Sequence, residues 1–136
     1  MAQGGDRWDH LSYYERKYLK VAIEAYDKII EDTDDIPKIA QHYQLDIEEV
    51  KRAKNYAFGD GVRTWGFSPD LWMAQAWQRL ANGEGNECDE LLLNHEVFES
   101  KLVINKSMTI QDAHQLAQAR YPWSLRLLEW RKQNHE

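Results

Sequence analysis

Residues 88–121 read CDELLLNHEVFESKLVINKSMTIQDAHQLAQARY, and this stretch indicates most clearly that the chain is helical. Apolar residues recur every three or four positions up to about Ile104, and the spacing resumes after Thr109 and continues to about Tyr121. The pattern predicts two amphipathic helices joined by about four residues. Helices with so short a connection usually pack antiparallel, so we expect their apolar faces to meet.

The remainder of the chain carries the same periodicity. From their caps and apolar spacing, further helices are predicted over about 12–32, 35–43, 46–58, 69–81 and 122–133. Between the third and fourth of these, residues 59–68 are expected to form an ordered loop with Trp65 and Phe67 anchored in the core. A short piece near 62–65 has the only strand character in the chain.

The composition fits one folded domain. A chain of 136 residues is near the commonest domain size, and its six Trp and seven Tyr are too many for a disordered chain. We therefore predict an all-α protein, in which residues 1–136 form a single irregular helical bundle of about six to seven helices. Residues 1–11 are expected to be flexible.

The net charge and the cysteine content restrict the classes of binding partner and the cellular compartment that we expect. The chain has 17 basic and 23 acidic residues, a net charge of −6, which disfavours nucleic-acid binding because phosphate neutralisation needs a basic footprint. Cys88 is the only cysteine, so an internal disulfide is excluded. No apolar run approaches the ~18 residues of a membrane span, and the N-terminus lacks a signal-peptide pattern. We expect a cytoplasmic protein with no export signal of its own and no membrane contact.

Residues 36–58 have the spacing of a helix-turn-helix. In a DNA-binding protein of this class, the N-terminal residues of the second helix enter the major groove. Here those residues are Asp46, Glu48 and Glu49, which would repel phosphates. We therefore interpret the segment as an ordinary helical hairpin, and we expect nucleic acid only as a substrate.

Residues 88–121 also carry a cluster of polar residues on apolar helix faces. At about 100° per residue, His95 and Glu99 fall in the middle of the apolar face of the first helix, and Glu96 lies at its edge. His114 projects from the apolar arc of the second helix. A buried carboxylate without a partner costs several kcal/mol, so we expect His95, Glu99 and His114 to point into one shared interior.

A metal site is one chemistry that these residues fit. His95, Glu99 and His114 would bind a divalent metal such as zinc, and Glu96 would act as a base toward a water that the metal activates. The pattern is that of HExxH with the second His replaced by Glu.

Two other interpretations stay open. In metal-independent RNA cleavage, a Glu takes a proton and a His returns one, with Arg79 or Arg120 available to stabilise a phosphoryl oxyanion. Alternatively, the cluster is a buried polar network with a purely structural role.

Three segments resemble a helical domain found at the C-termini of phage head-morphogenesis-type proteins and bacterial polymorphic toxins. They are AQAWQRL at 74–80, DxxLLxHExxE at 89–99 and DAHxLA at 112–117, followed by Tyr121. The resemblance covers roughly residues 36–125, and its most specific piece is the HExxE helix followed by the Ala-His helix. A departure occurs after Lys54 and Asn55, where Tyr56 stands in place of the family's His.

The resemblance implies a toxin-like or phage-associated effector module with a protein partner, an immunity or phage protein. The site residues that it carries over are His95, Glu96, Glu99, His114 and Arg79.

Two classes of function follow. A hydrolase or nuclease would have an open cleft that reaches His95 and His114. A non-catalytic interaction module would have a closed His/Glu network and would dock on its partner through Trp65, Trp72 and an acidic surface.

Overall fold

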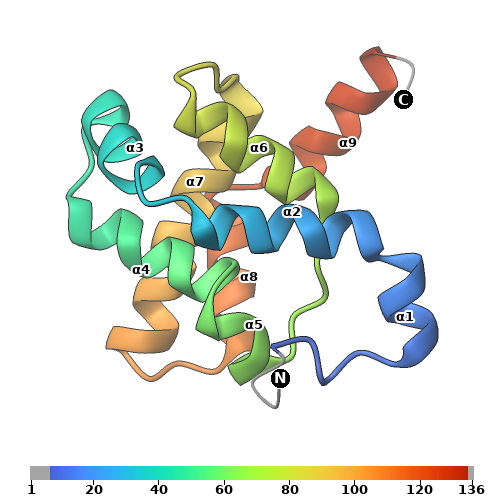
Figure 1. Ribbon diagram of the computed structural model, residues 1–136. Coiled ribbons are helices and arrows are strands. Elements are labelled where there is room, and N and C mark those ends of the chain that lie inside the picture. The colour runs from blue at the N-terminus through green and yellow to red at the C-terminus, as the bar shows by residue number, and fades with distance from the viewer. Residues whose placement is uncertain (1–6, 135–136) are drawn as a thin grey trace.

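The computed structural model describes residues 7–134, and all regular structure in that range is helical (Figure 1). Nine α-helices and one π-helix follow in the order α1 (Tyr13–Tyr18), α2 (Lys20–Glu31), α3 (Asp35–Tyr43), α4 (Ile47–Ala57), α5 (Asp60–Trp65), α6 (Leu71–Ala81), α7 (Glu87–Ser100), η1 (Lys101–Asn105), α8 (Ile110–Arg120) and α9 (Trp123–Gln133). The all-α prediction is confirmed. The expected count of about six to seven helices is too low.

One additional helix arises because the first predicted helix is divided at Leu19. Ser12 and Glu15 form the expected capping box at the start of α1, but Leu19 has φ −99° and ψ 18°, outside helical values. No residue of α1 is buried, whereas α2 buries Ala22 and Tyr26. Core contacts therefore hold α2 in place but do not hold α1 in line with it.

The second additional helix is α5, which replaces the loop and the short strand expected within residues 59–68. Gly61 makes this helix possible, because a Cβ there would lie 1.9 Å from the carbonyl oxygen of Tyr56. Gly66 ends the helix with φ +67°, in the left-handed region. Trp65 remains 37% exposed, although its ring lies 5.3 Å from that of the buried Tyr56. Phe67 packs against the core cluster of Tyr56, Val103 and Ala113, as expected.

Residues 7–11 pack against the core, in contrast to the flexibility expected for 1–11. Arg7 donates hydrogen bonds to Asp27 at 3.0 Å and to the carbonyl of Phe58 at 2.6 Å, and the side chains of Trp8 and Leu11 are buried. Aromatic anchoring therefore overrides the polar composition of this segment. Residues 1–6 lie outside the described residues.

Helix α7 runs through the middle of the bundle and contacts α4, α6, α8 and α9 (Figure 1). Such a helix is covered on several sides, so its polar residues are buried together with its apolar ones. Its buried residues are Cys88, Asp89, Leu92, Leu93, His95, Glu96, Glu99 and Ser100. The main apolar core lies beside it, around Tyr26, Phe58 and Trp77.

The segment expected to be a helical hairpin forms α3 and α4, which pack on each other. Two of the three basic residues of α4 are bound within the fold, while Lys51 is exposed. Lys54 binds Asp35 at 2.8 Å in a buried ion pair, and Arg52 donates to the carbonyl of Val97 on α7 at 2.9 Å. These side chains are therefore not available for DNA.

Candidate functional site

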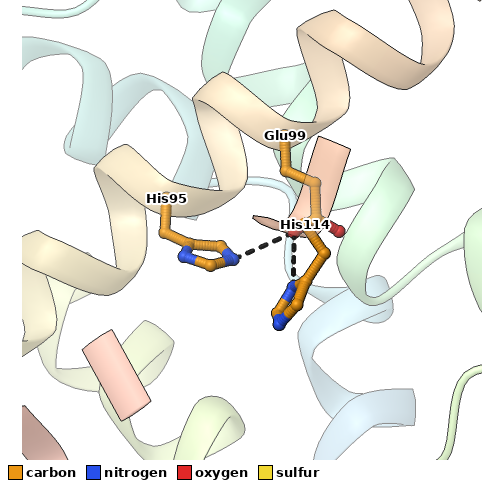
Figure 2. A group of neighbouring side chains, drawn as sticks. All are labelled: His95, Glu99 and His114. Carbon is orange, nitrogen blue, oxygen red and sulfur yellow. Dashed lines mark hydrogen bonds and ion pairs between the residues drawn. The ribbon is translucent and has the colours of Figure 1, made fainter. Parts of the chain in front are cut away.

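The site is built where α7, α8 and α4 meet. Figure 2 shows His95 and Glu99 projecting from α7, while His114 approaches from α8. Nε2 of His95 lies 2.9 Å from Oε1 of Glu99, and Nδ1 of His114 lies 2.9 Å from the same oxygen. One potential ligand atom from each of the three residues lies within 4.8 Å of the others. The fold thus joins the residues predicted to share one interior.

The exposure of the four residues agrees with the prediction for His95 and Glu99 but not for Glu96 and His114. His95 and Glu99 are each 4% exposed, as predicted. Glu96 is 5% exposed rather than an edge residue, because α7 is enclosed by more than one neighbouring helix. The His114 side chain is 54% exposed, so it reaches Glu99 from the surface and does not lie inside the bundle.

The hydrogen bonds of His95 show that Nδ1 carries a proton. Nδ1 lies 3.1 Å from the carbonyl oxygen of Tyr121, and a carbonyl only accepts, so Nδ1 donates. The other ring nitrogen, Nε2, is directed to Glu99. A histidine that binds a metal commonly donates its other N–H to a backbone carbonyl in this way. Because Tyr121 follows α8 directly, the same helix places both this carbonyl and His114.

Tyr56 is a site residue that the sequence analysis did not assign. Its hydroxyl on α4 donates to Oε2 of Glu99 at 2.5 Å, so both oxygens of the carboxylate have partners. The pair is 43 residues apart in sequence. The only signal for it was the departure from the family pattern at position 56.

Glu96 and Glu99, the two carboxyl groups of α7 that line the cavity, have opposite electrostatic environments. Burial and the charge of Glu99 raise the pKa of Glu96 to about 8, although His95 opposes this. Burial also raises the pKa of Glu99, but the hydrogen bonds from His95, Tyr56 and His114 outweigh it and leave that pKa lowered. Glu96 therefore tends to hold a proton, while Glu99 is ionised.

The charge state of His95 follows that of its neighbours. Burial lowers the pKa of His95, but the hydrogen bond to Glu99 and the charge of Glu96 raise it more, so the net shift is upward. An imidazolium is favoured beside the ionised Glu99.

A cavity of about 280 Å³ adjoins the cluster and is lined by His95, Glu96, Glu99 and His114. Ala57, Met73 and Leu92 supply apolar wall. The exposed residues Ser68 and Ser124, together with His114, place its mouth at the surface. A molecule from solvent therefore has a route to the cluster, as a cleft-type site requires.

The two arginines considered as oxyanion stabilisers lie elsewhere. Arg79 donates two hydrogen bonds to Asp89, at 2.7 and 2.8 Å, and joins α6 to the first turn of α7. Arg120 lies over the rings of Phe98 and Tyr121. Neither arginine lines the cavity, so a direct role for them in the site is not supported.

Comparison with known proteins gives no match: no family model fits the chain, and no curated protein or solved structure is significantly similar to it. The likeness to phage and toxin domains therefore stays a prediction from the three motifs. Across residues 7–134, none of the helices combines the length and the apolar character that crossing a membrane requires.

Replacement of Tyr56 by Phe should destabilise the protein. The variant leaves an oxygen of the buried Glu99 without its donor, so we expect the free energy of unfolding to fall by about 1–3 kcal/mol in urea denaturation. Tyr18→Phe, at an exposed tyrosine, is the matched control and should change it by less than about 0.5 kcal/mol. Equal effects of the two substitutions would contradict this role for Tyr56.

Glu96→Gln should alter the pH dependence of stability. The folded protein holds the Glu96 proton more tightly than the unfolded chain, so wild-type stability should fall as pH rises from the ordinary pKa of glutamic acid to about 8. The variant lacks this loss and should therefore gain stability relative to wild type across that window, by a few kcal/mol at its upper end.

Urea denaturation at a series of pH values, with a chelator present, measures this difference. Glu90→Gln, an exposed position on α7, is the control and should follow the wild-type curve. Parallel curves for wild type and Glu96→Gln would show that the Glu96 carboxyl does not titrate as expected.

Proposed function

We propose that this chain is a hydrolytic effector domain in which His95, Glu99 and His114 bind a divalent metal ion, with zinc as the first candidate. The observation that carries the proposal is the convergence of their three ligand atoms, within 4.8 Å, at the wall of a cavity with an exposed mouth. Two His and one carboxylate form a known ligand set of catalytic zinc sites, which leave a fourth position for water or substrate.

The distances fit an ion once the two histidines move closer together. Ligand atoms about 2.0–2.2 Å from a tetrahedral zinc ion lie ~3.3 Å apart. Glu99 now lies 2.9 Å from each His, whereas the three ligand atoms together spread over up to 4.8 Å. The exposed ring of His114 has room for this movement. The carbonyl of Tyr121 would keep the His95 ring in orientation, and the hydroxyl of Tyr56 would do the same for the Glu99 carboxylate.

Glu96 is the residue suited to proton transfer. It lines the same cavity, is buried, and has no hydrogen-bond partner within residues 7–134. A bound metal would supply Lewis acidity. Glu96 would accept a proton from the attacking water and return it to the leaving group, and its raised pKa suits both steps near neutral pH.

The assignment as an effector rests on the resemblance. The motif residues that imply a toxin-like or phage-associated module include His95, Glu96, Glu99 and His114, and all four line one cavity. A cytoplasmic target and a protein partner, such as an immunity or phage protein, belong to the same proposal.

A non-catalytic interaction module is the second candidate. It is favoured by the three internal donors of Glu99, because they satisfy the buried carboxylate without any ion. The aromatic docking patch that it requires is weakly developed. Arg131 lies 4.6 Å over the ring of Trp72, and Trp65 packs against Phe67.

Metal analysis of the purified protein tests the site. We expect one zinc ion per chain by elemental analysis or by titration. His95→Ala and Glu99→Gln should lose it, while Glu96→Gln should retain it. His42→Ala, at an exposed histidine of α3, is the matched control and should also retain it. A wild-type protein that binds no divalent metal would contradict the metal site.

Expression in bacteria tests the effector activity. The wild type should inhibit growth, and both His95→Ala and Glu96→Gln should relieve the inhibition while keeping the helical circular dichroism spectrum. Since Glu96→Gln is expected to keep its metal, loss of toxicity in that variant separates catalysis from metal-supported folding. Inhibition that persists in both variants would favour the interaction module.

A further inference from the structure

The charge of the cavity wall restricts the substrate. Its carboxyl residues are Asp70, Glu96 and Glu99, and no Lys or Arg of residues 7–134 lines it. Three basic side chains of the surrounding helices are bound by other groups: Arg52 by Val97 and Ser100, Lys54 by Asp35, and Arg79 by Asp89. The cavity therefore has no Lys or Arg to meet an anion, and the chain as a whole has a net charge of −6.

A cavity without Lys or Arg is poorly suited to a phosphodiester. Enzymes that cleave phosphate esters place Arg, Lys or metal cations against the phosphoryl oxygens, and nucleic-acid binding depends on neutralising several phosphates. Here, the proposal supplies one metal ion, and the ionised Glu99 already offsets part of its charge. A neutral substrate does not need further cations.

Two hydrogen-bonding groups of the wall have no partner in the described fold. No hydrogen bond reaches the carboxyl of Glu96, and the indole N–H of Trp123 is buried without an acceptor in a residue that lines the cavity. Trp123 begins α9, which packs on α7, so the cavity wall combines a residue with an unpaired donor and a residue with an unpaired acceptor. An amide group carries the complementary pair, a carbonyl acceptor and an N–H donor.

The remaining wall fits a small neutral group. Ala57, Met73 and Leu92 give apolar contact, and the volume of about 280 Å³ is near the lower end of the ~300–1,000 Å³ usual for ligand sites. Such a cavity has room for one amide and the side chain next to it. A nucleotide with its phosphates is both larger and of the wrong charge.

We propose that the substrate is a neutral amide, in a peptide or in a small N-acyl compound, and not a nucleic acid. This inference rests on the hydrolytic function proposed above. The oxygen of one water molecule bonds to the carbonyl carbon, and the C–N bond breaks. Glu96 takes a proton from the water and delivers it to the leaving nitrogen, so the products are a carboxylic acid and an amine, with no change of oxidation state.

Turnover by the zinc-loaded full chain tests the substrate class. The pools are a fluorogenic peptide library, a mixture of N-acetyl amino acids, and single-stranded RNA and DNA, with Glu96→Gln as the inactive control. We expect cleavage in one or both amide pools, which separates peptide from small N-acyl compound, and none of the nucleic acids. Nucleic-acid cleavage that Glu96→Gln abolishes, or the absence of amide turnover, overturns the inference.

The same experiment distinguishes the two proposals. A protein without stoichiometric zinc contradicts the proposed metal site, whatever its substrate. A zinc-loaded protein that cleaves RNA through Glu96 leaves the hydrolase intact and refutes only the amide substrate.

Binding to the zinc-loaded protein gives an independent measurement, with N-methylacetamide as the neutral amide probe and inorganic phosphate as the anion. We expect N-methylacetamide to bind more tightly than phosphate. Trp123→Phe keeps the aromatic bulk and removes the N–H, and it should raise the Kd for N-methylacetamide about tenfold without loss of zinc.

A lysine introduced at the mouth of the cavity should change the relative affinity for phosphate and for the neutral amide. Ser124→Lys should tighten phosphate binding, whereas Gln41→Lys, on the exposed face of α3, makes the same charge change away from the cavity and should not. Tighter binding of phosphate than of N-methylacetamide by the wild type, or an unchanged Kd for N-methylacetamide in Trp123→Phe, counts against the amide assignment.

Discussion

A carboxyl group removed from water must be met by donors or by a cation, or must keep its proton, and α7 carries Glu96 and Glu99 into the interior on adjacent turns. Glu99 is met by three donors, from His95, His114 and Tyr56, which hold it ionised. Glu96 has no donor in the described fold and instead retains its proton. One helix thus presents an ionised carboxylate and a protonated carboxyl group to the same cavity, and every chemical role proposed for the site starts from this difference.

The central position of α7 explains what could be predicted from the sequence. Periodicity identified the main helices and the burial of His95 and Glu99, because a helical wheel reports one face against one core. The periodicity placed Glu96 at the edge of the apolar face, because a helical wheel does not show that a second helix packs against the other side. The short α5 escaped detection because two glycines bound it, and glycine is normally a sign of a loop. Tyr56 and Trp123 enter the site through tertiary packing, which local spacing does not encode.

The arginines show how a plausible catalytic residue can serve the scaffold instead. Arg79 is bound in a two-point contact by Asp89, which also caps the first turn of α7. The contact anchors the beginning of the helix whose later turns carry the cluster. Because Arg79 lies outside the cavity, no Lys or Arg among the described residues lines it, and the proposed preference for a neutral substrate starts from this absence.

The π-helix η1 at the end of α7 has a consequence for comparing sequences. A π-turn accommodates one more residue than an α-turn, and such turns arise through the insertion of a single residue. Loss of one residue from η1 would rotate the following chain by about 100° around the helix axis and direct α8, with His114, away from Glu99. The number of residues between Glu99 and His114 is therefore as important for recognising this cluster in another sequence as the residues themselves. In a homologue that keeps the HExxE and Ala-His motifs but changes this spacing, we expect the two side chains not to meet.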